Sequence, residues 1–346
     1  MTTSVDMTAV SIPSDISRKI ERMPKMEIHV HLEGATDPET VFKLAQKNKI
    51  PLPAKTLEDW RAFFKFKNFP HFIEVYTSSC TAFQTLEDWA YLSETFLKNQ
   101  AAQNIRYSEV FLSTSHHLKK FPKRDFLDAL MAGAKAGEEK YGSKMKLIAD
   151  VSREMPDTRH DVLEFALMGK DAGFVIGLGL GGLEKEFPPR LFSDIYSEAD
   201  KQGLHNVAHA GEAAGPESIA EAIEKLAIKR IGHGVRVLED SSLVKTLAES
   251  KIPFEVNPIS NYRLGIVPKE APHPIHQMLA NGLYCTVNSD DPTMFDTSLS
   301  NEYKVLASQG MDWEALWQLN LNTLEATFLS DAEKSAYRKE WKAFTE

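Results

Sequence analysis

Two histidines spaced two residues apart are the first residues in this sequence whose pattern suggests chemistry. Histidine is scarce, at 11 of 346 residues, yet His29 and His31 both fall within the apolar run 27–32. That run has the composition of a β-strand, and residues i and i+2 of a strand project from the same face. Both imidazoles should therefore point the same way where the strand ends, before Gly34 allows a turn. Two imidazoles on one face are suited to binding a transition metal.

Residues of the same chemical kind recur at the ends of later apolar runs. His209 lies in AHAGE, His233 lies in IGHG, and the pair Asp290 and Asp291 lies in NSDDP. Three imidazoles and one carboxylate form a suitable ligand set for Zn²⁺ or a similar ion, with one position left open for water. Binding to such an ion lowers the pKa of water to about 7, so that it becomes a nucleophile at neutral pH. The pattern therefore predicts metal-assisted hydrolysis.

The remaining polar residues of these segments have separate roles in such a site. Glu212 follows His209 by three residues, where it can reach a substrate as proton donor. In a dry site its pKa would be raised, which suits a proton donor. Glycines flank His233, so its backbone can approach closely and its ring can hold the nucleophilic water. Asp290 and Asp291 are adjacent and point in different directions, so one can bind metal while the other contacts water or substrate.

Each of these features also has a structural explanation. A single histidine in a strand is more often a packed residue than a ligand, and Asp-Asp-Pro is common in turns and helix caps. The glycines around His233 would fit a tight turn, and Glu212 could cap the helix that follows AAGPES. The combination favours a site, because all the features fall at strand ends. The other histidines are expected to be loop, helix-face or strand-start residues, with His71 undecided: His116, His117, His160, His205, His273 and His276.

Eight apolar runs that alternate with amphipathic segments determine the predicted fold. The runs are 27–32, 105–112, 146–153, 174–180, 204–210, 229–234, 252–258 and 283–289. Alternating strands and helices predict a parallel sheet, and eight such units predict an α/β fold of the (β/α)8 TIM-barrel type. The C-terminal strand ends of such a barrel converge on one mouth, which would bring the candidate residues together. With no linker or repeat, residues 1–346 are interpreted as one metal-dependent hydrolase domain.

Two segments depart from this regular alternation. The connection from Lys49 to about Tyr107 is longer than one crossover helix needs, which predicts extra helices inserted after the first strand. It contains the Phe-rich segment 61–76, and long insertions of this kind are often lids. We expect most of its rings (Phe63, Phe64, Phe66, Phe69 and Phe72) to pack on the barrel, with one or two facing the pocket. Residues 1–20 are interpreted as a loose N-terminal arm.

Composition limits the partners and the compartment. The net charge of −9, from 40 basic and 49 acidic residues, argues against nucleic acid as a partner. The only cysteines, Cys80 and Cys285, form no CxxC motif, which indicates a reducing compartment. No run approaches 18 apolar residues, and no apolar segment typical of a signal peptide opens the chain, so no membrane partner is expected. The expected protein is cytoplasmic and acts on a small molecule, and nothing indicates its oligomeric state.

Five motifs in this order resemble the adenosine deaminase family of the amidohydrolase superfamily. They are PKxExHxHLEG, HAGE, RIGHG, NPxSN and NSDDP, and the resemblance runs from about Pro24 to about Tyr303. It implies a (β/α)8 barrel that hydrolytically removes the 6-amino group of a purine, giving the 6-oxopurine and ammonia. It also implies one Zn²⁺ per chain, bound by four residues carried over by position: His29, His31, His209 and Asp290.

The resemblance assigns the remaining motif residues to the substrate. Glu212 would protonate ring N1, and His233 would orient the hydroxide. Asp291 would hydrogen-bond N7, and the backbone of Gly182 would contact N3. Glu33 stands where adenosine deaminases carry an aspartate that contacts the ribose 5′-hydroxyl, so Glu33 would face the sugar.

Three departures from the family pattern bear on the substrate. The acid at Glu33 is longer, the usual CPxSN reads NPISN at 257–261, and residues 177–189 read GLGLGGLEKEFPP where an LAGDE-like string is usual. These changes touch the sugar side and the pocket wall, so they favour a purine nucleoside, either adenosine or 6-aminodeoxyfutalosine. The alternatives are an adenine deaminase acting on the free base and a non-catalytic metal-binding barrel. Amide or phosphoester hydrolysis usually needs a bridging carboxylated lysine or a second metal, and no lysine ends the fourth or fifth strand.

Overall fold

Eight parallel strands form the centre of the computed structural model, which describes residues 12–65 and 69–345. They pair in chain order: β1 (Lys25–His31), β2 (Ile105–Leu112), β3 (Lys144–Ser152), β4 (Val175–Gly181), β5 (His205–Ala210), β6 (Arg230–His233), β7 (Pro253–Val256) and β8 (Tyr284–Val287). An isolated parallel bridge between Val30 and Asp290 joins β1 to the segment just after β8. The predicted (β/α)8 barrel is therefore confirmed.

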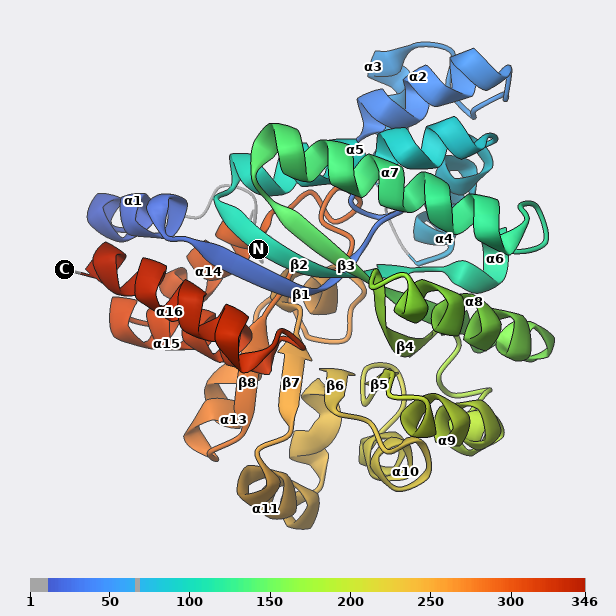
Figure 1. The fold of residues 1–346 in the computed structure, drawn as a ribbon. Helices are drawn as coiled ribbons and strands as arrows, with labels where there is room; N and C mark the ends of the chain where they lie inside the picture. Colours follow the sequence, from blue (N-terminus) through green and yellow to red (C-terminus); the bar gives the residue numbers. More distant parts are fainter. Residues whose placement is uncertain (1–11, 66–68, 346) are drawn as a thin grey trace.

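Helices surround this barrel (Figure 1). Those that follow β2 and the later strands are α6 (Thr114–His117), α7 (Lys123–Tyr141), α8 (Arg159–Asp171), α9 (Ser193–Lys201), α10 (Pro216–Leu226), α11 (Ser241–Ser250), α12 (Pro258–Arg263), α13 (Ile275–Ala280), α14 (Leu299–Ser308), α15 (Trp313–Ala326) and α16 (Asp331–Thr345). Among the residues described, no helix is both long and apolar enough to cross a membrane.

The predicted insertion after the first strand is present. Its described residues form four helices: α2 (Pro38–Asn48), α3 (Leu57–Phe64), α4 (Phe69–Thr81) and α5 (Leu86–Ala102). Phe64 is buried and packs edge-on against Trp60, with ring centroids 5.5 Å apart. Phe72 stacks on Phe295, which follows β8 at the mouth of the barrel, with ring centroids 5.4 Å apart. These contacts agree with packing on the barrel, while Phe66 and the side chain of Phe69 lie outside the described residues.

The N-terminal segment is more ordered than the sequence indicated. Residues 1–11 lie outside the described part, but Ser14–Arg22 forms helix α1, so the expectation of a loose arm over residues 1–20 is wrong from Ser14 onward. Ile20 is fully buried, and Glu21 forms an ion pair with Lys304 on α14. Burial of an apolar side chain and a charge pair hold this short amphipathic helix against the barrel.

Candidate metal centre and active site

The strand ends bring five side chains that could bind a metal together at one mouth of the barrel. His29, His209, His233 and Asp290 are all buried, and one ligand atom from each lies within 4.8 Å of the others. His31 lies against the same group, with Nε2 3.3 Å from His209 Nε2 and 3.3 Å from Asp290 Oδ1. The whole predicted ligand set therefore converges, and His233 makes a fifth candidate donor for a four-coordinate ion.

The outer nitrogens of two of these histidines show which atoms face the centre. His29 Nδ1 lies 2.7 Å from Glu255 Oε2, and His209 Nδ1 lies 3.0 Å from the carbonyl oxygen of Leu180. Each oxygen accepts the Nδ1 proton, so the Nε2 lone pair is turned inward, an arrangement typical of metal-binding histidines. In the described chain, His29 Nε2 is buried without a hydrogen-bond partner, 3.5 Å from Asp290 Oδ1.

The electrostatics of the cluster favour a cation at its centre. Burial lowers the pKa of His29, but the nearby carboxylates of Asp290 and Glu255 raise it to a net value of about 9. Burial opposes protonation of His31 as well, yet the charge of Asp291 and the contact with Asp290 raise its pKa to about 10. These carboxylates favour positive charge on the neighbouring imidazoles, and a divalent ion would supply that positive charge in place of the protons. The donor set therefore fits Zn²⁺.

A chain of buried charges supports the centre from inside the barrel. Arg230 Nε lies 2.5 Å from Glu255 Oε1, and the Arg230 guanidinium also pairs with Glu109. All three side chains are essentially inaccessible to solvent. Glu255 thus pairs with Arg230 through one oxygen and with His29 through the other, which fixes the His29 ring. No sequence motif predicts this network, and its one signal in the sequence is the presence of charged residues inside otherwise apolar strands.

Close packing and strained backbone hold the ligands in place. His233 and Asp290 have φ values of 59° and 65°, in the left-handed region that non-glycine residues rarely adopt. A Cβ on Gly34 would lie 1.7 Å from Asp291 Oδ1, and one on Gly232 would lie 3.1 Å from His29 Cε1. The close approach of Asp291 therefore requires glycine at position 34, and a side chain at position 232 would be tightly packed against His29.

Glu212 stands beside the metal cluster on a tightly held loop. Its Oε1 lies 3.7 Å from His233 Nε2, and its side chain is 18% exposed. Burial and the charges of Asp290 and Glu184 raise the pKa of Glu212 to about 8, so its carboxyl carries a proton near neutral pH. The buried Glu184 accepts hydrogen bonds from four successive backbone N–H groups, at 211–214, over 2.6–3.2 Å. This second carboxylate fixes the loop and was not identified from the sequence.

The predicted substrate contacts line the same mouth. Asp291 is 7% exposed with no partner for Oδ1 within the described chain, and burial and the neighbouring Asp290 raise its pKa to about 7. Gly182 directly follows β4 and has a φ of 98°. Glu33 is fully buried, and its Oε1 accepts hydrogen bonds from Ser113 N at 3.0 Å and His117 Nε2 at 2.9 Å. One oxygen of Glu33 is therefore already occupied by the protein.

Two residues of this wall were not expected from the sequence. His117, interpreted as an ordinary histidine, lies on α6 and donates to Glu33. Asp150 on β3 is 4% exposed, its Oδ1 has no hydrogen-bond partner among the described residues, and it fills the space beside Gly179 and Gly181. A carboxylate placed like this lies against the site without belonging to the metal cluster.

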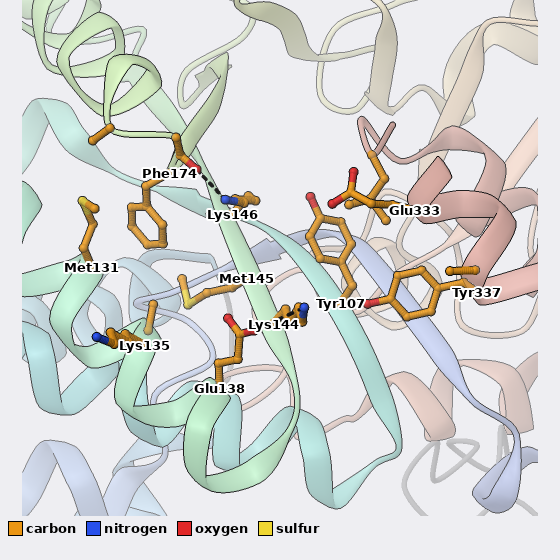
Figure 2. Close-up of a pocket in the computed structure, with 15 residues that line it drawn as sticks. Tyr107, Met131, Lys135, Glu138, Lys144, Met145, Lys146, Phe174, Glu333 and Tyr337 are labelled. Carbon is orange, nitrogen blue, oxygen red and sulfur yellow. Dashed lines mark hydrogen bonds and ion pairs between the residues drawn. The ribbon is translucent and has the colours of Figure 1, made fainter. Parts of the chain in front are cut away.

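A separate cavity of about 460 Å³ lies at the other end of the barrel (Figure 2). Tyr107, Lys144 and Phe174 line it near the beginnings of β2, β3 and β4. Its lysines are engaged locally, since Lys144 Nζ lies 3.2 Å from Glu138 and Lys146 donates to the carbonyl of Gly173. None of the predicted site residues lines this cavity, so the chemistry is assigned to the opposite mouth.

Comparisons with known proteins agree with this geometry. The sequence model of the family named adenosine deaminase matches residues 24–343. An adenine deaminase of Ectopseudomonas mendocina is 36% identical over 310 residues, covering 89% of this chain and 98% of that protein. An adenine deaminase of Vibrio parahaemolyticus is 33% identical, covering 92% of this chain and 95% of that protein.

Solved structures show the same fold. The crystal structure of adenine deaminase from Arthrobacter aurescens superposes with a TM-score of 0.87 at 31% identity, covering 93% of this chain and 99% of that one. An amidohydrolase from Burkholderia ambifaria, solved with bound Zn, gives a TM-score of 0.88 at 26% identity, covering 98% of this chain and 95% of that one.

The cluster predicts tight metal binding that depends on its inward-facing imidazoles. Purified protein should contain about one Zn²⁺ or equivalent ion per chain. His29→Ala should lose most of it, because Nε2 of His29 is buried with no other partner in the described chain. His205→Ala is the matched control, since His205 begins β5 at the opposite end and stacks on Phe328. Full metal content in a folded His29→Ala protein would contradict the assignment.

The four hydrogen bonds from the backbone at 211–214 to Glu184, which we call the loop clamp, predict that Glu184 stabilises the fold. Glu184→Gln replaces an oxygen acceptor by an amide N–H₂ that faces backbone donors, leaving buried N–H groups unsatisfied. The free energy of unfolding should fall by about 1–3 kcal/mol in denaturant titrations. Glu186→Gln, two residues away and exposed, should change it little. Equal stability of the two variants would exclude the clamp.

Proposed function

The chain belongs to the adenosine deaminase family of metal-dependent purine deaminases, and from this premise we propose that it hydrolyses free adenine to hypoxanthine and ammonia. The choice of the free base rests on relatives named as adenine deaminases, which are 31–36% identical over most of the chain. This choice replaces the nucleoside favoured by the sequence, which becomes the second candidate.

The position of Glu33 supports the free base over a nucleoside. The preference for a nucleoside rested on Glu33 as a partner for the 5′ side of a ribose. In the structure this carboxylate is fully buried, and the hydrogen bond and charge of His117 outweigh burial and lower its pKa. Glu33 is thus an ionised group already bonded to Ser113 and His117, which leaves only Oε2 without a partner in the described chain. It is better suited to shaping the pocket than to binding a sugar hydroxyl.

Four residues would hold Zn²⁺: His29, His31, His209 and Asp290. When bound, the ion lowers the pKa of a coordinated water to about 7 and so supplies a nucleophile. In the overall reaction a C6–O bond would replace the C6–N bond. One proton of the attacking water would leave with the amino group as ammonia, and the other would make good the proton that the chain gives to ring N1. The protein must supply a proton to the ring during attack, since negative charge would otherwise accumulate on it.

The chain's own groups are placed for this proton transfer and for holding the ring. Glu212 is protonated near neutral pH and lies at the cluster, where it can donate to N1. Asp291, with its raised pKa, can donate a hydrogen bond to N7, and the backbone N–H of Gly182 can donate to N3. Each of these donors matches a lone pair on the ring of neutral adenine, so together they orient C6 toward the nucleophile.

Substrate choice is tested by comparing 6-aminopurines directly. Adenine, adenosine and 6-aminodeoxyfutalosine are incubated with zinc-loaded protein, and loss of the 6-aminopurine absorbance is followed. Adenine should have the highest kcat/KM, by a factor on the order of 10² over either nucleoside, because Glu33 is already bonded to Ser113 and His117 and is poorly placed to bind a sugar hydroxyl. A higher kcat/KM for either nucleoside would overturn the free-base proposal while leaving deamination intact.

Glu212→Gln tests the acid. The amide keeps the shape of the side chain but cannot transfer a proton, so kcat should fall by a factor on the order of 10²–10⁴ with metal content unchanged. Glu217→Gln is the matched control, because Glu217 accepts a hydrogen bond from Gly215 N at the start of α10. If Glu212 were only a cap, its variant would show near-normal kcat and a lowered Tm.

A further inference from the structure

We propose that three buried side chains behind His233 are positioning residues that fix its tautomer, with the ring proton on Nε2. They are Asn257, Asn261 and His273, which lie at the end of β7, on α12 and just before α13. The catalytic meaning of this arrangement rests on the proposed deamination, but the arrangement itself is a property of the chain that can be measured without substrate.

We call Asn257, Asn261 and His273 the relay. It begins at His273, which the sequence predicts to be an ordinary loop or helix-face residue. It is 1% exposed, and the backbone N–H of Ile275 donates to its Nδ1 at 3.1 Å. A backbone N–H can only donate, so Nδ1 carries no proton. Burial lowers the pKa of His273 to about 3, so the ring is neutral and its proton lies on Nε2. Nε2 therefore donates to Asn261 Oδ1, 3.1 Å away.

The two asparagines transmit this orientation to His233. Because Oδ1 of Asn261 is occupied by His273, its Nδ2 is the atom that faces His233 Nδ1, at 3.3 Å. Asn257 Nδ2 donates to the carbonyl oxygen of Glu255 at 3.1 Å, which fixes that amide as well, and lies 3.3 Å from the same His233 Nδ1. Two amide donors thus converge on one ring nitrogen. A proton on that nitrogen would face their hydrogens, so Nδ1 must be the acceptor.

The consequence is a hydrogen-bond donor directed into the active site. His233 Nε2 carries the proton and lies 3.7 Å from both Glu212 Oε1 and Asp290 Oδ2. A protonated ring nitrogen has no lone pair for a metal, so His233 is excluded as a ligand although it lies within the cluster. The coordinating set is then His29, His31, His209 and Asp290, and His233 is free to hold the oxygen of the nucleophile.

The Asn257 side of this relay depends on a departure noted in the sequence. The usual CPxSN motif reads NPISN here, with asparagine at 257. A cysteine thiol at this position would be a weaker donor than an amide N–H. Asparagine at this position therefore places a stronger donor behind His233 than cysteine would.

The tautomer can be measured directly by NMR. In protein labelled with [¹⁵N]histidine, metal-free and zinc-loaded, long-range ¹H–¹⁵N correlations distinguish protonated from unprotonated ring nitrogens, and His233→Gln assigns the signal. The expected pattern for His233 is unprotonated Nδ1 and protonated Nε2 in both forms. A protonated Nδ1 in the wild-type protein would overturn the proposal, whether or not adenine is the substrate.

Metal binding gives a second readout that does not depend on turnover. His233→Gln should retain about one Zn²⁺ per chain, and His31→Gln should lose most of it. The reverse result, with metal lost from His233→Gln and kept in His31→Gln, would mean that Nε2 of His233 has a free lone pair and would overturn the relay.

Variants of His273 test the relay at a distance from the substrate. His273→Phe keeps the edge-on packing against Tyr262 but removes the donor to Asn261. With adenine it should lower kcat by about 10-fold or more while KM and metal content stay within about twofold. His273→Gln, whose amide can both accept from Ile275 and donate to Asn261, should restore most of the loss. His276→Phe, a substitution on α13 that leaves the hydrogen bond between His273 and Asn261 in place, is the control.

The outcomes separate the relay from a purely structural role. Equal losses in His273→Phe and His273→Gln, or a loss in KM alone, would indicate packing and overturn the positioning role. Absence of any adenine turnover in the wild-type protein, together with the expected tautomer, would refute the proposed substrate and leave the relay standing.

Discussion

Closure of the barrel between β1 and the segment after β8 is the contact on which the rest of the site depends. The backbone of Asp290 accepts from His31 N at 2.8 Å and donates to His29 O at 3.1 Å. Side chains complete this seam, since Asn288 Oδ1 accepts from Ile28 N and Glu27 accepts from Ser289 N, each at 3.0 Å. Residues about 260 positions apart thereby become neighbours, and the left-handed backbone of Asp290 turns its carboxylate into the cluster.

This closure places an unusual density of ionisable groups out of contact with water. Glu255 is shared between Arg230 and His29, while Asp290 lies against three imidazoles. Buried charges are costly unless they are paired, and the inward nitrogens of the metal-binding histidines gain their natural partner in a divalent cation. The same crowding raises the pKa of Glu212 and so keeps a proton available beside the cluster. Metal binding and acid catalysis are thus two results of one electrostatic arrangement.

The barrel and the ligand set could be predicted because they depend on signals that are local in sequence. Strand and helix periodicity located all eight strands within a few residues, and the residue types at their ends indicated a metal. The supporting groups were missed for a physical reason: Glu255, Asn261 and His273 act through partners on other elements, which no local pattern records. Helix α1 was missed because its order comes from burial of Ile20 against the barrel.

The prediction of the substrate was limited in the same way, by contacts between distant segments. The longer acid at Glu33 indicated a changed sugar contact, but its engagement by Ser113 and His117 depends on how β1 and the segment after β2 meet. The identity of a residue predicts its chemistry, whereas its neighbours decide which of its hydrogen-bonding atoms remain available to a substrate. For this chain the neighbours and the adenine deaminase relatives together support the free base.

The central claim is that the barrel deaminates adenine by means of one bound ion, which the residues at this mouth hold. It is tested most directly by stripping the metal with a chelator and titrating Zn²⁺ back while measuring adenine loss and ammonia release together. Activity should be absent in the metal-free protein, rise linearly with added Zn²⁺ and stop rising at about one ion per chain, with one ammonia released per adenine consumed. Full adenine turnover in the metal-free protein, or zinc binding at one per chain without adenine loss, would contradict this account.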